Sequence, residues 1–131
     1  MPGRILVVDD QDDILQTTAL VLRKGGYDVE TASKGLDALE AIRREKPDLV
    51  LLDIEMPGMD GWETLRLLRL EEATRDVPVA MFSILFDVNE KIRALQLGAQ
   101  EYVTKPFSVD DLLGRIELIL GGRSAGGQEA P

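Results

Sequence analysis

Short apolar runs alternate with segments of helical periodicity along the whole chain, and this pattern repeats five times. Strands are predicted over residues 4–8, 27–31, 48–52, 77–82 and 99–103, and all but the second and the fifth are largely apolar. A run that is apolar at successive positions predicts a strand buried on both faces, which is typical of a parallel sheet. The segments between the runs place apolar residues at helical spacing. Strict alternation of strand and helix therefore predicts an α/β fold, with a parallel sheet and helices on both of its faces.

Turn and capping residues divide the chain further. Asp12 is predicted to cap the first helix and Ser108 the last one. Gly114 lies inside the last helix, where a glycine costs up to about 1 kcal/mol relative to alanine. Residues 1–120 are predicted to form one domain, and residues 121–131, rich in glycine and alanine, a flexible tail or a truncated linker.

The charge and the missing residue types exclude several functions. The 131 residues include 24 acidic and 15 basic side chains, a formal net charge of −9, which argues against direct binding of nucleic acid or of an anionic membrane. Histidine and cysteine are absent, so any metal site or chemistry must use carboxylates, which favours a hard cation such as Mg²⁺. No signal peptide or apolar run of membrane-spanning length is visible, so we expect a cytoplasmic protein.

Reactive side chains stand where the predicted strands end. Asp9 and Asp10 follow the first strand, Asp53 the third, Ser83 the fourth and Lys105 the fifth. Ligands of open α/β sheets bind beyond these carboxyl ends. Three carboxylates at one edge would repel one another unless a cation such as Mg²⁺ lies among them, and a lysine and a hydroxyl there suit a phosphoryl group. Asp53 could then act as a nucleophile, since carboxylates form aspartyl phosphates. Any one of these residues alone would indicate only a turn or a cap.

Together these motifs resemble the receiver domain of bacterial two-component response regulators. The resemblance covers about residues 4–120 and is carried by VVDD (7–10), DLVLLDIEMPGMDGWE (48–63), the hydroxyl position after PVAMF, and GAQEYVTKPF (98–107). It implies a flavodoxin-like, doubly wound (βα)5 fold whose five parallel strands have the order 2-1-3-4-5. It also implies a signalling module and not an enzyme, since its chemistry acts on the module itself.

The resemblance assigns the metal site and the phosphoacceptor. Asp53 matches the residue that is phosphorylated. Asp10 and Asp53 match direct Mg²⁺ ligands, and the backbone carbonyl of Glu55 matches the third protein ligand. Asp9 matches the acid that acts through a water molecule.

The resemblance also assigns the switch. Lys105 matches the lysine that pairs with Asp53 and then with its phosphoryl group. Ser83 matches the switch hydroxyl, and Tyr102 matches the switch aromatic that turns inward on phosphorylation. The face made by the fourth helix, the fifth strand and the fifth helix, residues 88–120, is then expected to control a downstream protein or an output domain absent from this chain. The expected phosphoryl donor is a sensor histidine kinase or a phosphotransfer protein.

One departure keeps an alternative open. The switch hydroxyl is followed by Ile84, Leu85 and Phe86, where the family usually has a small residue first. These bulky residues motivate the hypothesis of a protein-binding module that works without phosphorylation. A phosphohydrolase acting on an external substrate is disfavoured, because Glu55 does not fit the general acid of such enzymes and no lid is present. The sequence does not choose between a stand-alone regulator and the receiver part of a longer chain.

Overall fold

The computed structural model describes residues 3–83, 87–105 and 108–124, the last three by their backbone alone. Its strands are β1 (Arg4–Val8), β2 (Asp28–Ala32), β3 (Leu49–Asp53), β4 (Val79–Ser83) and β5 (Glu101–Thr104). Its helices are α1 (Asp12–Lys24), α2 (Gly35–Arg44), α3 (Gly61–Leu70), α4 (Val88–Gln96) and α5 (Val109–Ser124). All strand pairs are parallel, and the sheet order is β2-β1-β3-β4-β5. The predicted fold class and strand order are confirmed.

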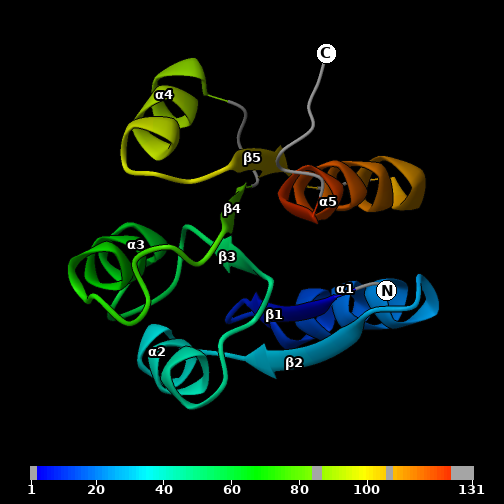
Figure 1. Ribbon diagram of the computed structural model, residues 1–131, viewed down its shortest axis with the longest axis horizontal. Coiled ribbons are helices and arrows are strands. Elements are labelled where there is room, and N and C mark those ends of the chain that lie inside the picture. The colour runs from blue at the N-terminus through cyan, green and yellow to red at the C-terminus, as the bar shows by residue number, and fades with distance from the viewer. Residues whose placement is uncertain (1–2, 84–86, 106–107, 125–131) are drawn as a thin grey trace.

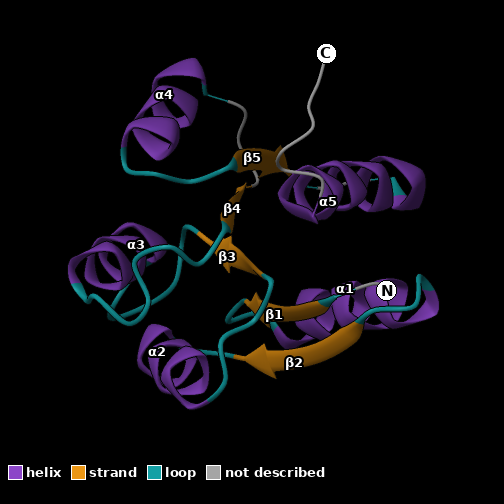
Figure 2. Cartoon of the chain, viewed as in Figure 1, coloured by secondary structure: helices purple, strands orange, loops and turns teal. Residues whose placement is uncertain are grey.

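The sheet is the middle of three layers (Figure 1). Helices α2, α3 and α4 cover one face, and α1 and α5 cover the other, as the purple and orange elements of Figure 2 show. The side chains of each strand alternate between the two faces. Leu6 and Leu52 therefore belong to the core under α2, α3 and α4, whereas Ile5 and Leu51 belong to the core under α1 and α5. Every residue of β3 and β4 is buried, as their apolar runs predict.

Element boundaries differ from the predicted ones by a few residues. Asp53 and Ser83 are the last residues of β3 and β4, where they had been expected just after the strands. The prediction that Asp12 caps α1 is wrong, because Gln11 holds the cap position and its backbone N–H donates to the Asp9 carboxylate at 3.0 Å. Helix α5 continues to Ser124, past the residue at which the tail was predicted to begin. The remaining tail residues lie outside the described part of the chain.

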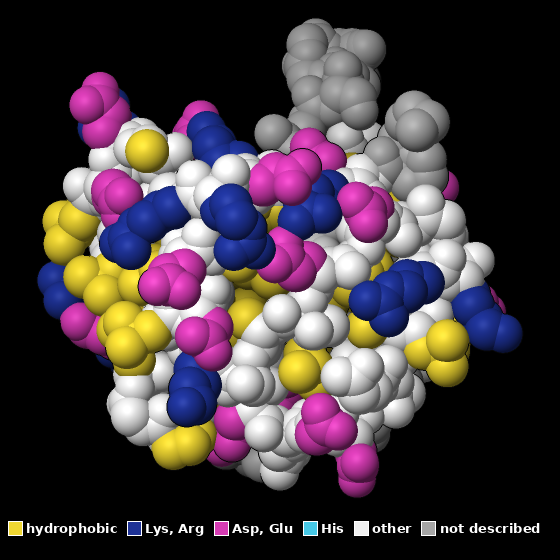
Figure 3. Space-filling model, turned by 90° about the horizontal axis from the view of Figure 1, so that it is seen from below, with side chains coloured by type: hydrophobic (Ala, Val, Ile, Leu, Met, Phe, Trp, Pro, Cys, Tyr) yellow, Lys and Arg dark blue, Asp and Glu magenta, His cyan; other side chains and the backbone are white. Residues whose placement is uncertain are grey.

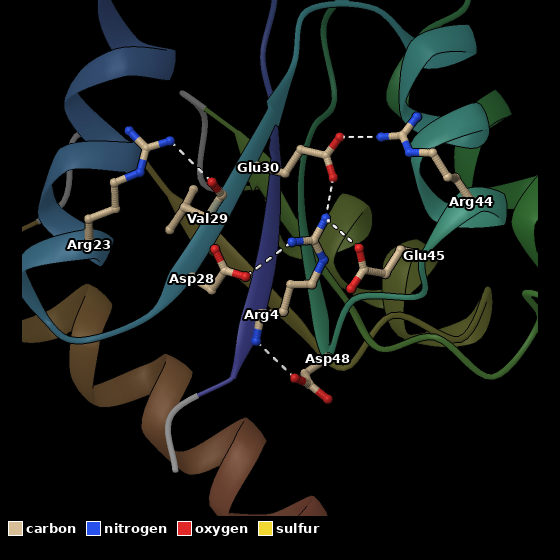
Figure 4. A network of polar contacts seen from close by, with 8 residues as sticks. All are labelled: Arg4, Arg23, Asp28, Val29, Glu30, Arg44, Glu45 and Asp48. Atoms are coloured by element: carbon tan, nitrogen blue, oxygen red, sulfur yellow. Dashed lines mark hydrogen bonds and ion pairs between the residues drawn. The ribbon is translucent and has the colours of Figure 1, made fainter.

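A network of charged side chains joins the ends of the strands that lie opposite the predicted site (Figure 4). Arg4, the first residue of β1, pairs with Asp28 at 3.2 Å and also with Glu30 and Glu45. Its backbone N–H donates to the Asp48 carboxylate just before β3 at 2.8 Å. The molecule seen from below, where edge strand β2 lies, shows acidic and basic side chains next to one another (Figure 3). These contacts link the start of β1 to β2 and to the segment just before β3.

The start of α3 approaches the end of β3 closely. The backbone N–H of Gly61 donates to the carbonyl of Ile54 at 2.8 Å, and a Cβ at Gly61 would lie 2.3 Å from the carbonyl oxygen of Asp53. Real Cβ atoms do not approach a backbone oxygen so closely. The Asp60 carboxylate caps the same helix by accepting from the N–H of Glu63 at 3.0 Å. A glycine is therefore needed at position 61 to seat α3 beside Asp53.

We expect Gly61→Ala to destabilise the protein by about 1–3 kcal/mol, because the added methyl group must push the backbone of β3 aside. Gly114→Ala is the matched control, because a Cβ there would meet nothing within 4 Å. This control should stabilise the protein by about 0.5–1 kcal/mol through helix propensity. Urea unfolding at neutral pH measures both changes, and a neutral Gly61→Ala would contradict the close approach.

Candidate functional site

Three carboxylates meet at one edge of the sheet. Val8, the last residue of β1, lies beside Leu52 of β3, so the residues that follow them, Asp9 and Asp53, also lie close together. Carboxylate oxygens of Asp9, Asp10 and Asp53 lie within 4.8 Å of one another. Asp9 and Asp53 are buried, whereas Asp10 is exposed at the rim. The sheet topology thus brings together the acids that the sequence predicted at this edge.

The Lys105 side chain lies between two of these carboxylates. Its Nζ donates to Asp9 Oδ2 at 2.7 Å and to Asp53 Oδ1 at 3.0 Å. All three side chains are at most 7% exposed. The Lys105 ammonium also lies 5.1 Å from the centre of the Phe82 ring, which belongs to the core under α1 and α5. The pairing with Asp53 had been expected, whereas the direct contact with Asp9 had not.

Burial and charge act against each other at this site. Burial raises the pKa of Asp53 to about 6, although Lys105 opposes this shift, and the charges of Asp9 and Asp10 add to it. Burial alone would lower the pKa of Lys105, but its bonds to Asp9 and Asp53 outweigh burial and raise it. Lys105 is therefore a permanent cation here. Asp53 stays mostly ionised at neutral pH and carries a charge that its surroundings only partly compensate.

The donor set fits a small divalent cation. Three carboxylates and one ammonium leave a formal charge of −2, and oxygen-only ligands suit Mg²⁺. Asp10 keeps the cluster open to solvent, through which a hydrated ion can reach it. Glu55 lies in the loop after β3 with an exposed side chain, so that its backbone remains the part predicted to bind the ion. The three predicted carboxylates thus lie together, and their assignment as ligands, like that of the Glu55 carbonyl, stays a prediction.

The two predicted switch residues, Ser83 and Tyr102, lie toward the face of the sheet that α2, α3 and α4 cover. Ser83 and Tyr102 are each 3% exposed. The Tyr102 hydroxyl donates to Glu90 Oε1 of α4 at 3.2 Å. Burial raises the pKa of Tyr102, a hydrogen bond with Ser83 lowers it, and the hydrogen bond and charge of Glu90 raise it. Tyr102 already points inward in this structure, whereas the resemblance implied that it turns inward on phosphorylation.

Sequence reasoning missed two contributors to the site. Phe82 lies next to Lys105, and its position in an apolar run indicated only a core residue. Glu90 accepts from Tyr102, and nothing in its local sequence distinguishes it from other acids of an exposed helix. The bulky residues 84–86, on which the alternative hypothesis rests, lie outside the described residues. No helix in the described part of the chain combines the length and apolar character that crossing a membrane requires.

Comparison with known proteins supports the same family. Residues 5–117 match the family model of the response regulator receiver domain. The phosphate regulon transcriptional regulatory protein PhoB of Pseudomonas aeruginosa is 39% identical over 127 residues, which cover 97% of this chain and 56% of that protein. The chain spans about half the length of the curated relatives that it matches.

Solved structures agree with the fold. A putative response regulator from Chloroflexus aurantiacus superposes with a TM-score of 0.86 at 35% identity, covering 92% of this chain and 99% of the other. The receiver domain of a sensor histidine kinase from Pseudomonas aeruginosa has a TM-score of 0.83 at 27% identity, covering 92% and 99%. That crystal structure has a magnesium ion coordinated in its active-site cleft. With a family match over nearly its whole length and the strand order and edge cluster described above, this chain belongs to the response regulator receiver domain family.

Proposed function

We propose that this receiver domain is a phosphorylation-activated switch that takes a phosphoryl group onto Asp53 from a sensor histidine kinase or a phosphotransfer protein. Its only chemistry would be its own phosphorylation and dephosphorylation. The observation that carries the proposal is the buried Lys105 ammonium between Asp9 and Asp53, next to a third carboxylate. A purely structural ion pair would need one acid, whereas this cluster has three.

The chemistry follows from the positions of the charges. A carboxylate oxygen of Asp53 attacks the phosphorus atom of a phosphohistidine. The new P–O bond forms as the P–N bond breaks, and the histidine leaves with that electron pair and takes up a proton. Lys105 lies 3.0 Å from Asp53 Oδ1, where its charge can stabilise the negative phosphoryl oxygens. Because the pKa of Asp53 is about 6, the nucleophile is mostly ionised at neutral pH.

The metal requirement belongs to the same proposal. Asp10, Asp53 and the backbone carbonyl of Glu55 would hold Mg²⁺ directly, with Asp9 acting through a water molecule. The ion would neutralise charge on the transferring phosphoryl group. The magnesium ion in the related receiver domain supports this assignment. Asp10 can serve this role because it has the exposed carboxylate of the cluster.

The output would be read from α4, β5 and α5. Phosphorylation adds about −1.5 to −2 charges and three acceptor oxygens at the end of β3. Ser83, at the end of the neighbouring β4, can donate to those oxygens. Tyr102 and the helices then settle in the packing that the new bonds favour. Several large apolar side chains are exposed on these helices and suit a protein partner or an output domain: Val88, Ile92, Leu95, Val109 and Leu118.

Phosphoryl uptake tests the proposal directly. The wild type, incubated with acetyl phosphate and Mg²⁺, should gain the mass of one phosphoryl group, and Asp53→Asn should not, because the amide is not a nucleophile. Asp13→Asn is the matched control, since Asp13 is exposed in the first turn of α1 and should leave uptake unchanged. Intact-mass spectrometry measures the gain. Equal labelling of the wild type and Asp53→Asn would reject Asp53 as the acceptor. No labelling of the wild type would reject the proposal and favour the phosphorylation-independent binding module.

The raised pKa of Asp53 predicts a pH-dependent stability. The folded protein binds a proton at Asp53 with a pKa of about 6, whereas the unfolded chain binds it near 4. Between these values the folded state holds more protons, so the wild type loses stability as the pH rises through this window. In EDTA, Asp53→Asn should therefore be about 1–3 kcal/mol more stable than the wild type at pH 7.5, with a smaller difference at pH 4.5.

Urea unfolding at the two pH values measures this difference. Added Mg²⁺ should stabilise the wild type and have little effect on Asp53→Asn, because the variant lacks one of the carboxylates that would bind the ion. A variant that is less stable than the wild type at pH 7.5 would contradict the view that the Asp53 charge is incompletely compensated.

A further inference from the structure

We propose that Glu90 is a positioning residue that holds Tyr102 in its inward orientation and thereby ties the switch to α4. The Tyr102 hydroxyl donates to Glu90 Oε1 at 3.2 Å, and Tyr102 is 3% exposed. The two residues belong to different elements, β5 and α4, so this bond joins an edge strand of the sheet to a surface helix. The inference rests on the proposed function and adds to it a residue, Glu90, that favours the inward over the outward position of Tyr102.

The helix cap of α4 fixes the backbone around Glu90 independently of the contact with Tyr102. Asp87 caps α4, and its Oδ1 accepts from the N–H of Asn89 at 2.8 Å and from that of Glu90 at 3.3 Å. The carbonyl of Asp87 accepts from the N–H of Lys91 at 2.9 Å. Glu90 is thus held in the first helical turn and is half-buried. The position of the Glu90 backbone is therefore set by the helix cap, and its side chain extends from this fixed point to the tyrosine.

The chemistry of the pair suits an inward tyrosine. An ionised carboxylate only accepts hydrogen bonds, and a neutral phenol supplies the proton. Burial and the Glu90 charge both raise the pKa of Tyr102, although Ser83 opposes them, so the phenol remains a donor at neutral pH. Tyr102 is also hydrogen-bonded to Ser83. Ser83, Tyr102 and Glu90 are therefore linked by hydrogen bonds that connect the end of β4 to α4.

The weak attachment of α4 makes this bond important. All residues of α4 are described, and Ala94 alone among them is buried. The same helix exposes Val88, Ile92 and Leu95, each by more than two fifths of its surface. When Tyr102 leaves its inward position, the Glu90 contact is lost, whereas the buried Ala94 and the contact of Arg93 with Trp62 remain. Glu90 thus couples the position of the tyrosine to the placement of this apolar surface.

Fluorine NMR of protein labelled with fluorotyrosine tests the proposal without any phosphoryl donor. The chain has two tyrosines, Tyr27 and Tyr102, and Tyr102→Phe identifies the second signal. Glu90→Ala should move the Tyr102 signal toward that of a solvent-exposed tyrosine, with the inward-to-outward ratio lowered about tenfold. Glu90→Gln keeps a neutral acceptor and should restore most of the inward signal. Asn89→Ala, an exposed neighbour on the same turn, should leave the signal unchanged.

A double-mutant cycle shows whether Glu90 acts through the tyrosine hydroxyl. The affinity for beryllofluoride with Mg²⁺ is followed by the fluorescence of Trp62, the single tryptophan, whose ring lies 4.2 Å from the Arg93 guanidinium of α4. Glu90→Ala should weaken this affinity up to about tenfold in the wild type and have no further effect in Tyr102→Phe.

An unchanged Tyr102 signal in Glu90→Ala overturns the inference, as does an equal shift in Asn89→Ala or an equal loss of affinity in both backgrounds. Failure of the wild type to bind beryllofluoride would reject the proposed function instead, and the NMR comparison would still decide the role of Glu90.

Discussion

The parallel direction of all five strands is the constraint on which the rest of this structure depends. It places the ends of β1, β3, β4 and β5 at one edge, so that residues far apart in sequence become neighbours. Lys105 meets Asp9 across 96 positions and Asp53 across 52. Burying this ammonium between two buried carboxylates joins the ends of three strands by charge. The third carboxylate, Asp10, then leaves an excess of negative charge that a divalent cation can neutralise.

The alternation of side chains along β4 places the residue beside the Lys105 ammonium and the switch hydroxyl on opposite faces of the sheet. Phe82 and Ser83 are neighbours in β4, yet their side chains serve opposite faces of the sheet. Phe82 lies in the core under α1 and α5 and contacts the Lys105 ammonium. Ser83 is hydrogen-bonded to Tyr102, which belongs to the core under α2, α3 and α4. One strand end can therefore contribute to charge stabilisation on one side and to the switch on the other.

Features with a local physical cause could be predicted from the sequence, whereas features that depend on contacts between distant residues could not. The uninterrupted apolar run before Asp53 predicted a buried parallel strand, and β3 is buried throughout. The capping of α1 was predicted wrongly because the backbone is still extended at Gln11 and already helical at Asp12, so that Gln11 holds the cap position. The contact between Tyr102 and Glu90 could not be predicted, since an acid in the first turn of a surface helix usually faces solvent. Strand ends differed by about one residue because ladder hydrogen bonds, and not side-chain patterns, set them.

The sequence by itself determined the order of the elements and the residue types at the strand ends, because periodicity and turn residues act over a few positions. Together with the family match, this is enough to place Asp9, Asp53, Ser83 and Lys105 at one sheet edge. Only the tertiary structure decided that Lys105 contacts both acids, that burial raises the pKa of Asp53, and that Tyr102 points inward against Glu90. These features depend on burial and on side-chain orientation between distant segments, which are set only when the layers pack together.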